Sequence, residues 1–227
     1  MSMIKVESIA DGVKKYLEQR IFTGKLKPGQ QIKEQEVAES LGVSRPPIRE
    51  ALKILEAEGL ITRRPNKGAF VTEIDEKDIW EIYTLKTTLY GLGTRLAFDR
   101  LTDSIMRKLD SIISKMKDCI DSEPPDISKY QNLNEQFHNM LLDAAGHGRL
   151  KKMASTLHNQ VKRFSYRSLA ERSHLERSYA YHKAILEAIK KGEREKAAQL
   201  TEEHVLEGLK VLQAIVRRSA TPQKGGC

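Results

Sequence analysis

The segment Glu34 to Leu60, EQEVAESLGVSRPPIREALKILEAEGL, constrains the fold more than any other part of the chain. It predicts a short helix over 34–41 that ends at Gly42, and another that begins after Ser44 and runs to about Glu58. Ser is a common N-cap, and a Pro-Pro pair is tolerated in the first turn of a helix. Two short helices around a tight turn predict a helix-turn-helix.

The sequence on either side extends this motif to a winged form. After it, LITRRPNKGAFVTEI predicts two short strands around a turn at 65–68. Before it, KLKPGQ reads as a loop, and an earlier helix is indicated by apolar residues at helical spacing: Ile9, Val13, Leu17 and Ile21. Three helices and a small hairpin predict a winged helix-turn-helix DNA-binding domain over residues 1–74.

The rest of the chain shows only helical patterns. We expect about six helices within residues 75–218, forming a helical ligand-binding bundle, and a disordered tail over 219–227. The first of these helices carries an apolar series: Ile79, Ile82, Leu85, Leu89, Leu92 and Leu96. The predicted fold class is therefore mainly α, with an N-terminal winged helix-turn-helix and a C-terminal all-helical bundle.

Composition narrows the classes of protein to consider. The chain of 227 residues carries 39 basic and 31 acidic side chains, a net charge of +8. Residues 1–72 hold 13 basic and 9 acidic side chains, so the charge is densest where the DNA-binding motif lies. No apolar run approaches the roughly 18 residues of a membrane span. The two cysteines, Cys119 and Cys227, fit neither a disulfide framework nor a zinc ribbon, and a cytoplasmic protein is expected.

Basic residues on the second helix of the motif indicate a DNA-reading surface. Arg45, Arg49 and Lys53 recur every four residues, on a different face from the apolar stripe that begins at Ile48. Such a helix can enter a major groove, where Arg bonds guanine or neutralises phosphate. Ser44 and the first-turn amides add a positive helix end that favours phosphate. A solvated basic face is the alternative, which the surrounding helix, turn and basic hairpin disfavour.

The hairpin supplies a second candidate contact. Lys67 and Gly68 lie at its tip, where a wing can reach the DNA backbone or minor groove. Arg63 and Arg64 flank the tip, and an ordinary charged turn explains them nearly as well.

Three of the six histidines fall on apolar faces of three different predicted helices. His138 follows Phe137, His182 lies one turn before Leu186, and His204 falls within an apolar stripe. Each alone is more commonly a hydrogen-bonded core residue, but three that converge would favour Zn²⁺, Ni²⁺ or Fe²⁺. Both interpretations stay open on these residues. The other three lie in less apolar surroundings: His147, His158 and His174.

The run LGVSRPPIREALKILEAEGL followed by RRPNKGAFV resembles the GntR transcriptional regulators, and the helical remainder resembles their FadR-type branch with an FCD effector domain. The resemblance implies a homodimer that reads a short palindromic operator in double-stranded DNA. It also implies that DNA is contacted by Ser44, Arg45, Arg49 and the wing around Lys67 and Gly68.

The resemblance further implies a divalent metal and a small organic acid in the helical domain. NEQFH matches the first element of the family's metal site, with Asn134 where Asp is usual and His138 in place, and His182 and His204 match the later ligands. Because an amide is neutral, we expect a metal site of reduced affinity.

Effector residues depart from the family pattern. In the helical domain, Lys86 and Tyr90 stand where Arg and Glu are common in the family. In the DNA-binding domain, Gln35 stands where some members carry a basic residue that contacts DNA. Arg163 and Arg167, one turn apart, are anion-binding candidates, with a solvated basic face as the alternative.

These features predict a ligand-responsive transcriptional regulator. A metal sensor, in which the ion is itself the signal, shares every site residue and stays open. A metal-dependent enzyme is disfavoured because the sequence has no HExxH, Gly-rich phosphate loop or GxSxG, and because it leaves the basic N-terminal domain unexplained.

Overall fold

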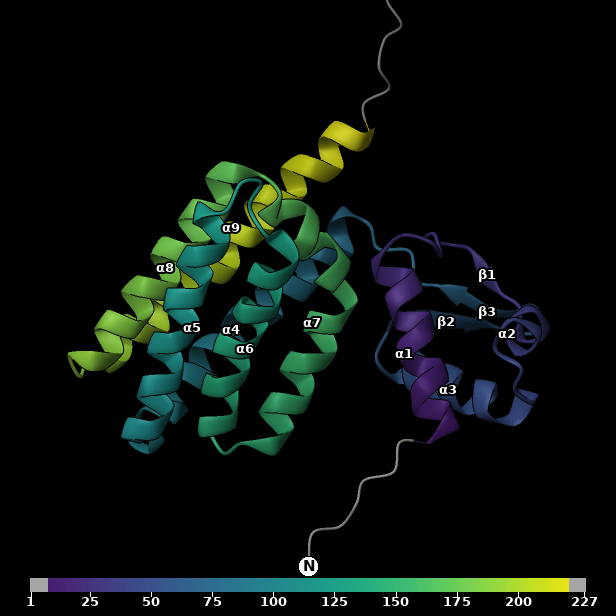
Figure 1. The fold of residues 1–227 in the computed structure, drawn as a ribbon, viewed down its shortest axis with the longest axis horizontal. Helices are drawn as coiled ribbons and strands as arrows, with labels where there is room; N and C mark the ends of the chain where they lie inside the picture. Colours follow the sequence, from purple (N-terminus) through teal and green to yellow (C-terminus); the bar gives the residue numbers. More distant parts are fainter. Residues whose placement is uncertain (1–7, 221–227) are drawn as a thin grey trace, which may run out of the picture. The chain divides into compact units, whose positions relative to one another are not determined.

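The computed structural model describes residues 8–220, except the side chains of residues 163, 216 and 218–220. It divides the chain into two compact units with a boundary between Ile74 and Asp75. Each unit has its own hydrophobic core, and each is described by itself below (Figure 1). Cys227 and most of the tail predicted over residues 219–227 lie outside the described residues.

The first unit contains three helices and a small sheet, in agreement with the predicted winged helix-turn-helix. In chain order these elements are α1 (Ile9–Phe22), β1 (Gln31–Ile32), α2 (Glu34–Leu41), α3 (Arg45–Ala57), β2 (Ile61–Arg64) and β3 (Gly68–Val71). The sheet is antiparallel, with strand order β1-β3-β2. The two predicted strands are present as β2 and β3. The third strand, β1, was not predicted, because two residues are too short to show a period and β1 is defined by its pairing with β3.

The start of α3 differs from the prediction in one respect. Ser44 occupies the N-cap position, but its side chain makes no capping hydrogen bond. An N-cap oxygen accepts from the amides of the second or third helical residue, and these are Pro46 and Pro47, which have none. The prolines fix the helical start, remove two of its amide donors and leave the exposed Ser44 hydroxyl without that bond.

The core of the first unit orients α3. Ile48, Leu52 and Leu55 are buried, and α1 packs against this face of α3. Between α2 and α3, Gly42 adopts a left-handed conformation with φ of 65°, which glycine tolerates without strain and which turns the chain sharply. The packed face of α3 thus directs its other face outward.

The second unit is a bundle of helices, as predicted (Figure 1). Its elements are α4 (Glu76–Ala97), a 3-10 turn η1 (Phe98–Arg100), α5 (Asp103–Asp121), α6 (Ile127–Ala144), α7 (Gly148–Leu169), α8 (Arg172–Lys190) and α9 (Arg194–Ala220). The predicted caps of the first two helices are present: Asp75 accepts from the Asp78 amide, and Thr102 accepts from the Ile105 amide.

Helix α4 lies against α6, α7 and α9. A Cβ atom at Gly91 would collide with Glu202 of α9, and one at Gly93 would lie 2.7 Å from Leu142 of α6, so glycine permits close approach on both sides. The face of α4 that turns inward carries Lys86 and Tyr90, both buried. No helix in residues 8–220 combines the length and apolarity that a membrane crossing needs.

Candidate DNA-contacting surface and ligand pocket

The exposed face of α3 carries the predicted basic residues. Arg45, Arg49 and Lys53 are all exposed, while the apolar stripe on the other side of the helix is buried. Their charged groups are therefore available to a ligand outside the unit.

Two polar residues at the start of α2 hold the arginines of α3. The Arg45 guanidinium donates to Gln35 Oε1 at 2.7 Å, and Arg49 Nε donates to Glu34 Oε2 at 2.8 Å. Both bonds are solvent-exposed, and such pairs contribute at most about 1 kcal/mol. These bonds orient the arginine side chains, and each can be replaced by a bond to another partner at little cost in free energy. The sequence reasoning missed both roles, which depend on the angle between α2 and α3.

The wing is a tight turn with a basic tip. Asn66 and Gly68 have positive φ values of 58° and 88°, and Gln31 of β1 donates to the Lys67 carbonyl at 2.7 Å. Lys67 is exposed at this turn. Arg63 and Arg64, by contrast, pair with acidic residues of their own unit, Glu56 and Glu73.

In the second unit, three histidines from three helices meet. His138 on α6, His182 on α8 and His204 on α9 are buried, and one nitrogen atom from each lies within 4.8 Å of the others. Their ring centroids are 4.4–5.2 Å apart. The structure thus brings together the three residues that one sequence could not show to converge.

The protonation of these rings suits a metal. Burial lowers the pKa of His138 and His204 well below the usual value, and that of His182 to about 4, so the imidazoles are neutral at pH 7. His182 Nδ1 lies 2.6 Å from the Ser178 carbonyl, which can only accept, so Nδ1 carries the proton. His182 Nε2 is then a free lone pair, and it is buried without a hydrogen-bond partner. A carbonyl that fixes the tautomer of a ligating histidine is typical of metal sites.

These donors fit a divalent cation. Three neutral imidazoles suit zinc-like ions, whose bonds to nitrogen are about 2.0–2.1 Å long. Asn134, one turn before His138 on α6, is half-buried and lines a pocket together with His138 and His204, which makes its amide oxygen a candidate further donor.

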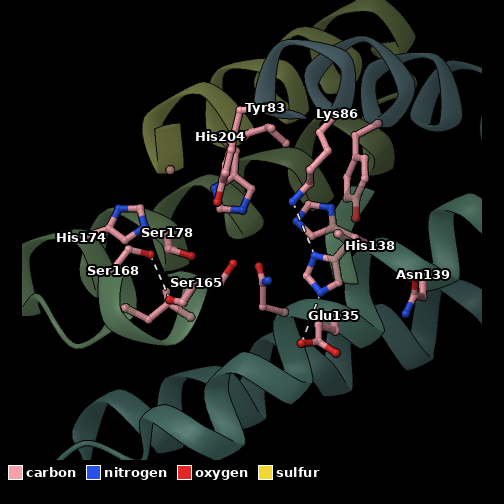
Figure 2. A pocket seen from close by; sticks show the side chains of 16 residues that line it. Tyr83, Lys86, Glu135, His138, Asn139, Ser165, Ser168, His174, Ser178 and His204 are labelled. Carbon is pink, nitrogen blue, oxygen red and sulfur yellow. Dashed lines mark hydrogen bonds and ion pairs between the residues drawn. The ribbon is translucent and has the colours of Figure 1, made fainter. Parts of the chain in front are cut away.

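Figure 2 shows the pocket beside the histidines. Lys86 and Tyr90 of α4 line it, as do His138 and His204. The Lys86 ammonium lies over the rings of Tyr83 and Tyr90, at 4.9 and 5.3 Å from their centroids. Burial lowers the pKa of Lys86 to about 8, against the opposing attraction of Glu135, so this lysine is mostly charged at pH 7.

A network that the sequence reasoning missed holds Lys86 in place. Lys86 Nζ lies 3.5 Å from His158 Nδ1, and His158 Nε2 lies 3.3 Å from Glu135 Oε1. Glu135 Oε2 accepts from Lys162 at 2.7 Å. Burial alone would raise the pKa of Glu135, but the bonds from His158 and Lys162 outweigh it and lower this pKa. The carboxylate therefore stays ionised beside the pocket.

Two further effector candidates, Arg163 and Arg167, lie on α7. Arg167 is exposed near the end of α7 and is not among the residues that line the pocket. The side chain of Arg163 lies outside the described residues. His174 and three serines of α7 and α8, which sequence reasoning did not select, line the pocket instead: Ser165, Ser168 and Ser178. Cys119 is a free, buried thiol.

Together the two units define a class: a winged helix-turn-helix followed by a helical domain is the architecture of a transcriptional regulator. Residues 9–71 match the bacterial regulatory proteins of the gntR family, and residues 81–207 match the FCD domain. The chain belongs to the GntR family and carries an FCD domain. Its domains and relatives are those of DNA-binding transcriptional regulators rather than enzymes.

Individual relatives agree with this assignment. The HTH-type transcriptional regulator YdhC of Bacillus subtilis is 30% identical over 190 residues, covering 84% of this chain and 83% of that protein. The gluconate operon transcriptional repressor of Bacillus licheniformis is 30% identical over 188 residues, covering 79% and 74%. The structure of Escherichia coli McbR/YncC matches 95% of this chain and 100% of that one, with a TM-score of 0.78 and 22% identity, and shows the same fold.

Proposed function

We propose that this regulator binds a palindromic operator as a homodimer, and that a small carboxylate bound beside a divalent metal in the helical unit alters its DNA binding. One observation carries the proposal: three buried, neutral histidines and a buried lysine line or adjoin one internal pocket. A cation site and a fixed ammonium within one cavity suit a small organic anion.

The metal would be held by His138, His182 and His204, with Asn134 as a weaker fourth ligand. Zn²⁺, Ni²⁺ and Fe²⁺ all accept imidazole nitrogen. Once bound, the ion supplies a Lewis-acidic position to which a carboxylate oxygen can bind. Because Asn134 brings no negative charge, the affinity should be lower than that of a carboxylate-containing site.

Lys86 and Tyr90 would bind the acid at the same end of the pocket. Lys86 is 5% exposed, and its ammonium faces two aromatic rings and a histidine. A buried cation without an acidic partner in direct contact gains much from an anion. The detection of a metal ion does not need the Lys86 ammonium. Its presence in the pocket therefore favours an organic acid as the signal over the metal ion as the signal.

On DNA, we assign base and phosphate contacts to Arg45, Arg49 and Lys53, with the Ser44 hydroxyl and the wing tip at Lys67 and Gly68 as backbone contacts. The proposal is supported by the exposure of all these residues. Relatives described as repressors of sugar-related operons suggest repression, released by the effector. Such a regulator acts in the cytoplasm, where bacterial DNA lies.

An apolar stripe on α4 supports the dimer. Leu85, Leu92 and Leu96 are 56%, 38% and 37% exposed, and Met153 on the adjoining α7 is 57% exposed. Clustered leucines on one helix indicate a protein interface, and a second copy of the chain brings an identical stripe. In a L92E/L96E variant we expect monomers by sedimentation at concentrations where the unchanged protein is dimeric.

The metal and effector are tested on the full-length protein. We expect bound metal in the purified protein by elemental analysis, and a higher melting temperature with added Zn²⁺ or Ni²⁺. H182A should abolish the shift, whereas H147N, at an exposed histidine, should retain it. Absence of metal and of any shift would refute the metal site. Titrating operator affinity with metal alone, then with metal plus organic acids, separates a metal sensor from an acid sensor.

A further inference from the structure

The pocket has a second polar end, centred on His174. This residue of α8 is 4% exposed, lines the cavity, and its Nδ1 atom is buried without a hydrogen-bond partner. A buried polar atom without a partner is costly, so this end of the cavity suits a ligand that forms a hydrogen bond with it. His174 is not within the cluster of possible metal ligands.

Two buried serines beside His174 leave complementary hydrogen-bonding capacity. Ser168 donates its hydroxyl proton to the Ser165 carbonyl at 2.9 Å, so its oxygen can still accept. Ser178 accepts from the Tyr130 hydroxyl at 3.0 Å, so its own proton can still be donated. Both serines line the cavity. This end can therefore donate to and accept from the same small group.

The charges around His174 favour a neutral partner. Burial lowers its pKa, so the ring is neutral at pH 7. Of the charged groups near it, Arg177 is paired with Glu207 at 2.8 Å, and Glu171 lies at the N-cap of the same helix. A second carboxylate would meet no free cation among these groups, whereas a hydroxyl both donates and accepts.

The two polar ends lie apart within one cavity. Figure 2 shows His174, Ser168 and Ser178 on one side and Lys86 and His138 on the other, with Tyr83 and His204 between them. A ligand that spans the cavity thus presents one end to cationic groups and the other to neutral hydrogen-bonding groups.

We propose that His174, Ser168 and Ser178 form a hydroxyl-binding subsite, so that the effector is a hydroxylated carboxylic acid with its carboxylate at Lys86 and the metal. The proposal rests on the carboxylate site proposed above and adds the chemical class that this site selects. An acid of the same chain length without hydroxyl groups would leave His174 Nδ1 unpaired and bind more weakly.

The test compares chain-matched acids by calorimetry on full-length protein saturated with Zn²⁺. The pairs are glycerate with propanoate, and gluconate with hexanoate. We expect at least one of the two hydroxylated acids to bind about tenfold more tightly than the hydroxyl-free acid of the same chain length. This is the effect of one or two neutral hydrogen bonds. H174L should remove this preference without changing Zn²⁺ affinity, and H174Q, which keeps a donor and an acceptor, should retain most of it. S168A is a smaller change and should reduce the preference for the hydroxylated acid about threefold. This variant replaces H174L in the test if H174L does not fold.

The outcomes separate the two proposals. Equal binding of hydroxylated and hydroxyl-free acids, or a preference that survives in both H174L and S168A, overturns the subsite and leaves the carboxylate site standing. If none of the four acids binds with or without Zn²⁺, the carboxylate site and the subsite both fall.

Discussion

The two units of this chain place their polar chemistry in opposite ways. In the winged unit, the arginines of α3 are exposed and already bonded to Glu34 and Gln35. In the helical unit, Lys86 and four histidines line a cavity, and several of the histidine nitrogen atoms have no partner. Exposed, loosely bonded cations can exchange partners with a large polyanion, whereas buried groups with unused hydrogen bonds suit a small ligand that the protein encloses.

The basic surface of the winged unit and the pocket of the helical unit are assembled in different ways. The surface site depends on side chains preset by neighbours on the same short motif. The buried site depends on groups from five helices, which no single segment of the sequence contains. We expect changes at the two sites to differ in the size of their effects, and the DNA surface should show the largest.

The DNA surface should fail when its cations are removed. R45A/R49A should lower affinity for operator DNA, selected from random sequence by the unchanged protein, by about 100-fold or more, since each bidentate Arg–guanine pair contributes about 1–3 kcal/mol. Fluorescence anisotropy measures the loss. K25A, an exposed cation in the loop before β1, should cost less than about threefold. Unchanged affinity in R45A/R49A would show that α3 does not read DNA.

The buried cation should make effector binding depend on pH. The pKa of Lys86 is lowered to about 8, so the ammonium is mostly present at pH 7 and is lost as the pH rises through 8. Affinity for the effector acid should fall about 30-fold between pH 7 and 9.5, because the charged fraction falls by that factor. K86R, which stays charged, should flatten the profile. A profile identical in both proteins would assign the dependence to another group.

Charge at the fourth metal position should set metal affinity. N134D replaces a neutral amide by a carboxylate, and we expect Zn²⁺ to bind about tenfold more tightly, as competition with a chelator would show. N134A should weaken binding instead. If all three proteins bind Zn²⁺ equally, position 134 does not contact the ion.

The bond from Gln35 to Arg45 should have a small effect. Q35A frees the Arg45 guanidinium, and we expect operator affinity to fall about threefold, the cost of ordering one side chain on binding. Q19A, on the exposed surface of α1, is the matched control. A gain in affinity with Q35A would mean that Gln35 competes with DNA for Arg45.

Sequence reasoning succeeded where one segment carries the whole signal. The helices and turn of residues 34–57 follow from local pattern, and the bundle follows from periodicity. It failed where a contact joins distant segments: β1 exists only through β3, and Glu135 and His158 meet across α6 and α7. The exposure of Leu92 and Leu96 likewise reflects which face of α4 its neighbours leave uncovered.

One missed residue did leave a signal in the sequence. His174, Ser178 and His182 are spaced four residues apart, which places them on one face of α8. Once His182 is taken as inward-facing, His174 follows. Its charged sequence neighbours obscured this, because they occupy the other faces of the same helix.

Pro46 and Pro47 have a consequence beyond the start of α3. At a typical N-cap, a serine hydroxyl accepts a hydrogen bond from an amide of the first helical turn. Here the ring nitrogens carry no hydrogen, so nothing at the tip of the helix competes for Ser44. Because no first-turn amide holds the hydroxyl oxygen, the Ser44 hydroxyl can rotate and direct either its oxygen or its proton away from α3.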